Sequence, residues 1–207
     1  MLTPDSPGRD QRPTPICLEF TNTMRWHASE RPDETIRSYA DLVAWARAAG
    51  VASDRSARHF LSRAKEHTAD ADLALTRAIS LREAIYRIFL ALMNDTPAQR
   101  TDLDELNGAI SRLTGGVRLV QTREEFAWEW RVDDDALDSF LWPIALSAVE
   151  LLLSEDRRWV GQCADDRGCG WLFLDTSKNH SRRWCDMNDC GNRAKQRRLH
   201  ERRQRTA

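Results

Sequence analysis

Four of the five cysteines fall within 28 residues, and this cluster constrains the chain more than any other feature of the sequence. They follow the pattern C-x5-C-x15-C-x4-C, at Cys163, Cys169, Cys185 and Cys190. A structural zinc ion takes four thiolates in a closed tetrahedron, and two cysteine pairs around a loop can supply them. The gaps of five and four residues are wider than the usual knuckle. The cluster predicts one structural zinc ion, with Cys17 outside the site.

Disulfide bonds and unrelated buried thiols are the alternatives to zinc. Residues 1–15 hold four prolines and no apolar segment, so we expect a disordered tail and not a secretory signal. Disulfides are rare in cytosolic chains. No apolar run reaches the roughly 18 residues that a membrane-spanning helix needs. We therefore expect a soluble cytoplasmic protein without a membrane segment, a setting that favours zinc.

The residues around the cysteines resemble a known family. The segments are Cys169-Gly170-Trp171-Leu172-Phe173-Leu174-Asp175, Ser181-Arg182-Arg183-Trp184-Cys185 and Cys190-Gly191-Asn192-Arg193. Together they resemble the CGNR zinc finger, and Cys17–Thr23 resembles the start of the ABATE domain that usually precedes it. The resemblance implies a stress-induced transcription regulator. We expect an ABATE-like helical domain at residues 16–156 and the finger at residues 157–207.

The cysteine segment predicts a small module that resembles a treble clef. Gly168 and Gly170 flank Cys169 and allow a tight turn there. His180 is a possible ligand, but four cysteines already close the site and leave no position for water, so the site is expected to be structural. The expected elements are a strand at Trp171–Leu174, its turn and return at Asp175–Arg183, and a final helix at Gly191–Arg203 that begins beside Cys190.

The net charge of −1 hides an asymmetry, because residues 157–207 carry +7 and residues 1–156 carry −8. The final helix repeats arginine at i,i+4 spacing, which costs about 0.2–0.5 kcal/mol per pair. Phosphate groups would offset this repulsion. A solvated, frayed tail is the alternative. The residues predicted to contact nucleic acid are Arg182, Arg183, Arg193, Lys195, Arg197 and Arg198.

Residues 16–156 predict a mainly α-helical domain with one β-hairpin, which we expect to fold without the zinc module. The hydrophobic content of 41 % supports a packed core. Apolar residues recur at helical steps over 71–94 and alternate over 117–131. The expected elements are a strand or extended segment at Ile16–Thr23, helices that begin near Ser38, Ser53, Ala71 and Thr96, and a hairpin that turns near Thr122–Glu125. A last helix is expected from Ala136 to about Ser154, which Pro143 should kink or split in two.

Three features of this domain leave a second role open. Asn22 can bond a neighbouring backbone, whereas the family resemblance implies a pocket there; Arg82 can pair with a buried carboxylate or line a pocket. The stretch Ile144–Leu153 is apolar nearly all round, so it is either buried or lies at the interface of a homodimer. The sequence does not identify a small-molecule ligand.

The sequence favours a DNA-binding transcription regulator whose helical domain senses a signal or dimerises. One alternative is a zinc-stabilised adaptor whose basic helix binds an acidic protein or the acidic helical domain of its own chain. The other is an RNA-binding protein. We do not expect an enzyme, because the sequence contains no nucleophile elbow, phosphate-binding loop, dinucleotide fingerprint or His-Glu zinc motif.

Overall fold

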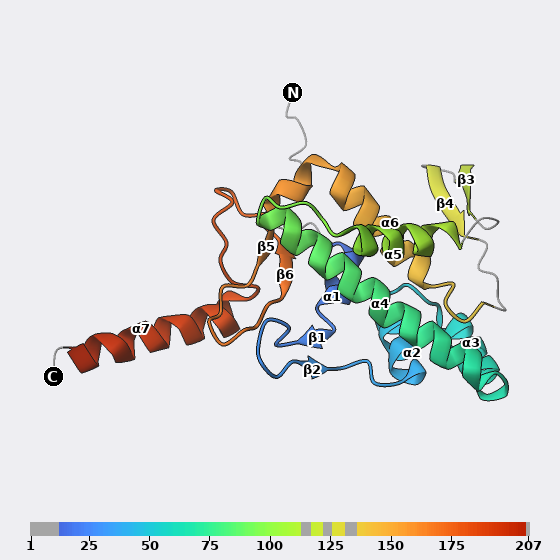
Figure 1. Ribbon diagram of the computed structural model, residues 1–207, viewed down its shortest axis with the longest axis horizontal. Helices are drawn as coiled ribbons and strands as arrows, with labels where there is room; N and C mark the ends of the chain where they lie inside the picture. The colour runs from blue at the N-terminus through green and yellow to red at the C-terminus, as the bar shows by residue number, and fades with distance from the viewer. Residues whose placement is uncertain (1–12, 113–116, 122–125, 131–135, 206–207) are drawn as a thin grey trace, which may run out of the picture.

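The computed structural model describes residues 13–112, 117–121, 126–130 and 136–205, and helices make up most of it (Figure 1). The helices are α1 (Ile16–Thr21), α2 (Tyr39–Ala48), α3 (Asp54–Glu66), α4 (Thr68–Met93), α5 (Arg100–Ser111), α6 (Leu141–Leu153) and α7 (Asn192–Arg205). The antiparallel strand pairs are β1 (Met24–Arg25) with β2 (Asp33–Glu34), β3 (Val117–Gln121) with β4 (Phe126–Trp130), and β5 (Val160–Gln162) with β6 (Leu172–Leu174). A 3-10 helix (Glu155–Trp159) precedes β5, and a π-helical turn (Met187–Gly191) precedes α7. The predicted fold class is confirmed, with the short pair β1–β2 as an addition.

Local sequence signals set the ends of α2 and α3. The hydroxyl oxygen of Ser38 accepts a hydrogen bond from the Asp41 N–H at 3.2 Å, and that of Ser53 accepts one from the Ser56 N–H at 3.0 Å. After α2, Gly50 takes a φ of +73°, the left-handed conformation that a helix C-terminus favours in glycine. Both predicted helix starts are confirmed.

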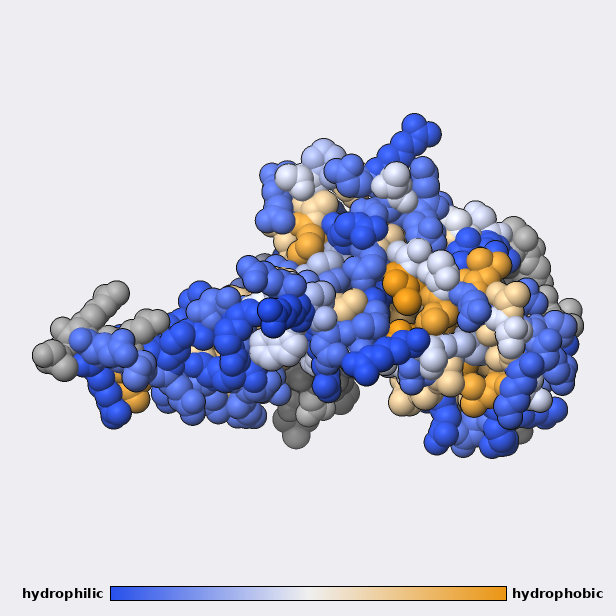
Figure 2. All heavy atoms as spheres, turned by 60° about the horizontal axis from the view of Figure 1, so that its bottom comes forward, coloured by the Kyte–Doolittle hydropathy of each residue, from blue (hydrophilic) through white to orange (hydrophobic). Residues whose placement is uncertain are grey.

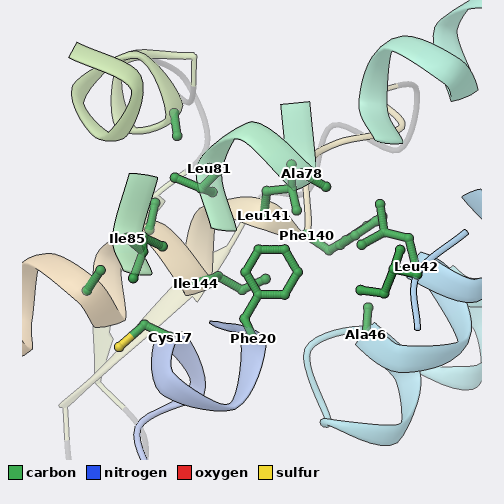
Figure 3. Packing of buried hydrophobic residues seen from close by; sticks show 14 of the residues in the cluster. Cys17, Phe20, Leu42, Ala46, Ala78, Leu81, Ile85, Phe140, Leu141 and Ile144 are labelled. Atoms are coloured by element: carbon green, nitrogen blue, oxygen red, sulfur yellow. The ribbon is translucent and has the colours of Figure 1, made fainter. Parts of the chain in front are cut away.

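Helix α4 lies at the centre of the domain and packs against α1, α2, α3, α5, α6 and β5. Figure 3 shows Leu81 and Ile85 of α4 near Phe20 of α1 and Ile144 of α6. Each of these four side chains is at most 1 % exposed. Most of the apolar face of α6 is therefore buried in the core of its own chain, although Leu153 at its end is 80 % exposed.

The extended segment predicted at Ile16–Thr23 is wrong, because residues 16–21 form helix α1. Its hydrogen bonds begin at the carbonyl of Pro15, which accepts from the Leu18 N–H at 2.9 Å. The buried side chains of α1, at Cys17, Leu18, Phe20 and Thr21, have helical spacing. Six residues are too few for that spacing to be distinguished from a strand by sequence.

The helix predicted from Ala136 is neither kinked nor split at Pro143, because α6 begins at Leu141. Pro143 therefore lies in the first turn, where its missing N–H would have had no partner within the helix. Residues 137–140 form a turn. Helix α5 likewise starts at Arg100, later than the start predicted at Thr96. The predicted hairpin is confirmed as β3–β4, although its turn at 122–125 lies outside the described residues, as do residues 1–12 of the predicted disordered tail.

Helix α7 projects away from the rest of the molecule (Figure 1). The space-filling view shows that this projecting arm is mostly hydrophilic (Figure 2). In the part of the chain that the structure describes, no helix is both long and apolar enough to cross a bilayer.

Candidate metal centre and basic helix

The first two cysteines of the cluster lie on the loop that joins β5 to β6. The Cys163 N–H donates to the carbonyl of Trp171 at 2.8 Å and extends the strand ladder into this loop. The strand predicted at Trp171–Leu174 is confirmed for residues 172–174, but it pairs with the upstream strand β5. The return strand predicted at Asp175–Arg183 is wrong, because this segment forms a loop.

Asp175 organises that loop. Its carboxylate accepts hydrogen bonds from the N–H groups of Ser177 and Arg182, at 2.9 and 2.8 Å. His180 lies in the same loop. Its Nδ1 is 2.9 Å from the Asp175 carbonyl oxygen, and its ring stacks on that of Trp159 with the ring centres 3.5 Å apart. His180 therefore has its own contacts away from the cysteines, in agreement with its expected place outside the site.

The glycines beside Cys169 bring the loop against another part of the chain. Gly168 and Gly170 have φ values of +87° and +70°. A Cβ atom at either position would lie 2.6 Å from backbone atoms, those of Ser29 for Gly168 and of Ala28 for Gly170. Both glycines are needed for the positive φ and for the close approach of the two backbones.

The second cysteine pair lies around the π-helical turn that precedes α7. Asp186 caps this turn, because its carboxylate accepts from the Asn188 N–H at 2.6 Å and from the Asp189 N–H at 3.2 Å. Cys185 lies before the cap and Cys190 lies inside the turn. The predicted position of Cys190 at the start of the final helix is confirmed.

The four cysteine sulfurs converge on one point. All of their Sγ atoms lie within 4.8 Å of one another. The Cys185 Sγ is 3.7 Å from that of Cys169 and 3.6 Å from that of Cys190. Four thiolates around zinc, each bonded at about 2.3 Å, place their sulfurs about 3.8 Å apart. The cluster therefore fits one structural zinc ion, and Cys17 lies apart from it in the helical core.

The protonation of the cluster also suits a divalent cation. Hydrogen bonds with the Cys169 and Cys185 thiols lower the pKa of Cys163. Hydrogen bonds with the Cys163 and Cys169 thiols, together with burial and the nearby sulfur charges, raise the pKa of Cys185. Thiols must lose their protons before they bind a cation, so metal binding and local folding are coupled.

Two family models match the chain. The ABATE model, described as "Putative stress-induced transcription regulator", matches residues 14–155. The chain belongs to the ABATE family. The CGNR zinc finger model matches residues 158–203 and contains the four-cysteine cluster. No curated protein matches the sequence.

Two of the six basic residues predicted to contact nucleic acid are engaged inside the CGNR finger. Arg193 donates from Nη2 to the Cys190 Sγ at 2.9 Å and from Nε to the Asp165 carboxylate at 3.3 Å. Arg197 pairs with Asp166 at 2.8 Å. Asp165 and Asp166 belong to the β5–β6 loop, so these two arginines hold α7 against the loop that carries Cys163 and Cys169.

The other four predicted residues lie more openly on the finger. Arg182 donates to the backbone carbonyls of Trp184 and Cys185, and its guanidinium lies 4.7 Å from the centre of the Phe173 ring. The guanidinium groups of Arg183 and Arg198 lie over the Trp184 ring, at 5.4 and 5.8 Å. Lys195 is exposed on α7. Arg183, Lys195 and Arg198 are all exposed, and no carboxylate among the described residues pairs with their cationic groups.

The finger is joined to the ABATE domain by backbone contacts. The Asn22 side chain donates to the Leu172 carbonyl and accepts from the Leu172 N–H, both at 2.9 Å. The His27 N–H donates to the Cys169 carbonyl, and the Tyr86 hydroxyl donates to the Gly170 carbonyl. Asn22 therefore bonds a backbone, as one interpretation predicted, but one that lies 150 residues away.

Arg82 pairs with a carboxylate, which was the first of its two predicted roles. Its side chain is 1 % exposed, and its two terminal nitrogens donate to the Glu34 carboxylate at 2.8 and 2.6 Å. Glu83 contacts Arg82 and lies 2.8 Å from the His27 Nε2. This ion-pair network braces the β1–β2 loop against α4.

Proposed function

We propose that the protein is a zinc-dependent, DNA-binding transcription regulator that docks through the outer face of α7. The observation that carries the proposal is the anchored helix itself. The metal cluster and the Arg193 and Arg197 contacts fix its first turns, while the rest projects from the molecule (Figure 1). Short, highly charged helices are marginal in water, so this one is suited to a polyanionic partner.

The docking face follows from the geometry of α7. Arg193 and Arg197 face the β5–β6 loop, whereas Lys195 and Arg198 are exposed and lie three residues apart on another face of α7. Helical spacing adds Arg202 to the same face. We propose that this face, with Arg183 and Arg182 beside it, contacts phosphates. Arg193 and Arg197 act inside the finger, so the six predicted residues divide into two groups.

Salt-dependent binding tests the proposal. If four to six phosphates are neutralised, the logarithm of the DNA-binding constant should fall against log salt with a slope of about −3.6 to −5.4. Lys195→Gln with Arg198→Gln should flatten the slope by about two units. Arg55→Gln with Arg58→Gln is a matched control, because both arginines are exposed on α3 at the same spacing and at the other end of the molecule (Figure 1).

The assay also separates the alternatives. Stronger binding to RNA than to DNA would favour an RNA-binding protein. Equal binding to DNA and to an acidic polymer, with affinity unchanged by zinc chelation, would favour the adaptor. A four-thiolate zinc site leaves no open position for a reactive water, so the proposal includes no catalytic role.

A homodimer is also proposed; sedimentation of the full chain would test it, and a monomer on DNA would contradict it.

A further inference from the structure

Arg193 has every nitrogen of its guanidinium group engaged within the chain. Nη2 donates to the Cys190 Sγ at 2.9 Å and Nε to the Asp165 carboxylate at 3.3 Å, while Nη1 pairs with Asp189. A phosphate contact would have to replace these bonds. The contact with Cys190 is the informative one, because the acceptor is one of the four converging sulfurs.

A tryptophan from the ABATE domain completes this arrangement. The Trp26 ring lies 5.4 Å from the guanidinium carbon of Arg193 and 5.2 Å from that of Arg167. Both arginines also pair with Asp165, whose side chain is 1 % exposed. Trp26 has a φ of +53°, in the left-handed region, which is uncommon for a bulky residue and indicates that its position is imposed by its surroundings.

We infer that Arg193 is a positioning residue for the metal centre and that Trp26 holds it in place. Four thiolates around a divalent cation carry a net charge of −2, and three of these cysteines are buried. The N–H···S bond from Arg193 brings a positive charge to the Cys190 sulfur and fixes its orientation. The aromatic face of Trp26 favours the cation by a cation–π interaction and restricts its movement. Outer partners of this kind commonly change metal affinity by about 10- to 100-fold.

Metal affinity of the full-length protein, measured by competition with a chromophoric chelator, tests the inference. Arg193→Gln should weaken zinc binding by about 10- to 100-fold. Arg193→Lys should lose less, because it keeps the charge but not the planar fork. Arg197→Gln is the matched control: it lies one turn along α7 and pairs with Asp166 and not with a sulfur, so zinc affinity should stay within a few-fold of wild type. Trp26→Leu should weaken binding less than Arg193→Gln does.

The absorption spectrum of the cobalt(II)-substituted protein distinguishes an effect of Arg193 on the cysteine sulfurs from a general effect on the fold. Cobalt in a four-thiolate site shows sulfur-to-metal charge-transfer bands, whose energy depends on the charge at sulfur. Arg193→Gln and Arg193→Lys should shift these bands, whereas Arg197→Gln should not. Unchanged zinc affinity together with unchanged cobalt bands in Arg193→Gln would overturn the inference. If that variant does not fold, the same result in Arg193→Lys would overturn it.

Discussion

The ABATE domain and the CGNR finger are held together by different forces. The domain surrounds α4 with apolar side chains such as Phe20, Leu81 and Ile144, which are almost wholly removed from water. The finger has a smaller cluster of three buried cysteines with partly buried tryptophans around it, and its loops depend on ion pairs and backbone hydrogen bonds. The domain should therefore keep its fold when the metal is lost, whereas the finger should not.

The two regions nevertheless share one buried apolar core. Val160, Leu172 and Leu174, all from the finger, belong to the same buried cluster as the domain core. The loop that joins these two strands carries Cys163 and Cys169, two of the four clustered cysteines. The strand pair β5–β6 therefore links the apolar core to the cysteine cluster.

Loss of a metal ligand should have the largest effect. Elemental analysis should find one zinc per chain; Cys185→Ser should lose it, while Cys17→Ser should keep it, because Cys17 is outside the cluster. Structural zinc contributes about 10–16 kcal/mol of apparent binding free energy in finger peptides. Full zinc occupancy in Cys185→Ser would refute the site.

In circular dichroism the metal-free protein and a fragment of residues 1–156 should both stay mainly helical; an unfolded fragment would show that the domain needs the finger.

A cavity at the centre of the domain should have the next largest effect. Leu81 is 0 % exposed, so Leu81→Ala should lower the free energy of unfolding by about 2–5 kcal/mol. Leu61→Ala on α3, where the side chain is 36 % exposed, is the control and should cost much less. Urea denaturation followed by circular dichroism measures both. Zinc stoichiometry below the transition should be unchanged in each, and its loss in folded Leu81→Ala would contradict the separation of the two regions.

Cutting the link between the regions should have a smaller effect. Asn22→Leu removes both hydrogen bonds to Leu172, each worth about 0.5–1.5 kcal/mol, so it should cost about 1–3 kcal/mol. Asn22→Asp should keep the acceptor for the Leu172 N–H but place an oxygen opposite the Leu172 carbonyl. Hydrogen exchange of the Leu172 amide should speed up most in Asn22→Leu. Equal protection in both variants and wild type would show that Asn22 does not join the regions.

The smallest expected effect is a change in acid sensitivity. Burial raises the pKa of Glu34, but hydrogen bonds and charge from Arg82 outweigh it, so the pKa lies below its ordinary value. A carboxyl group of this kind stabilises the fold above its unfolded pKa of about 4.3 and loses that contribution as pH falls through the folded pKa. Glu34→Gln should therefore flatten the fall in the urea midpoint below about pH 4. An unchanged acid limb would contradict this role.

Features encoded by neighbouring residues were predictable from sequence. The serine caps of α2 and α3 and the alternation of β3–β4 are signals of this kind, and all three are confirmed. The cysteine cluster was predictable because its members are rare and close together. The six-residue helix α1 was not, because so short an apolar segment fits either period.

The partners of the arginines depend on the tertiary fold and were not predictable. In sequence, Arg193, Arg197 and Arg198 form one basic stretch of equivalent charges. The fold separates them, because Asp165 and Asp166 reach Arg193 and Arg197 from a loop 28 and 31 residues earlier. The contacts of Trp26 were not predictable either. It is a large aromatic residue in a short polar segment, and nothing there indicates that two arginines would lie on its ring.

The close approach of the β5–β6 loop to residues 28 and 29 has a consequence for evolution. Gly168 and Gly170 leave no room for a side chain against the opposing backbone, so the finger fits only a partner that presents a matching loop. A gene fusion that joined this finger to an unrelated domain would leave the backbone at Gly168 and Gly170 without its opposing loop. Arg167 and Arg193 would also lose the ring of Trp26. The two segments are therefore expected to be inherited as a pair, and exchange of fingers between relatives should succeed only when the loop is exchanged with them.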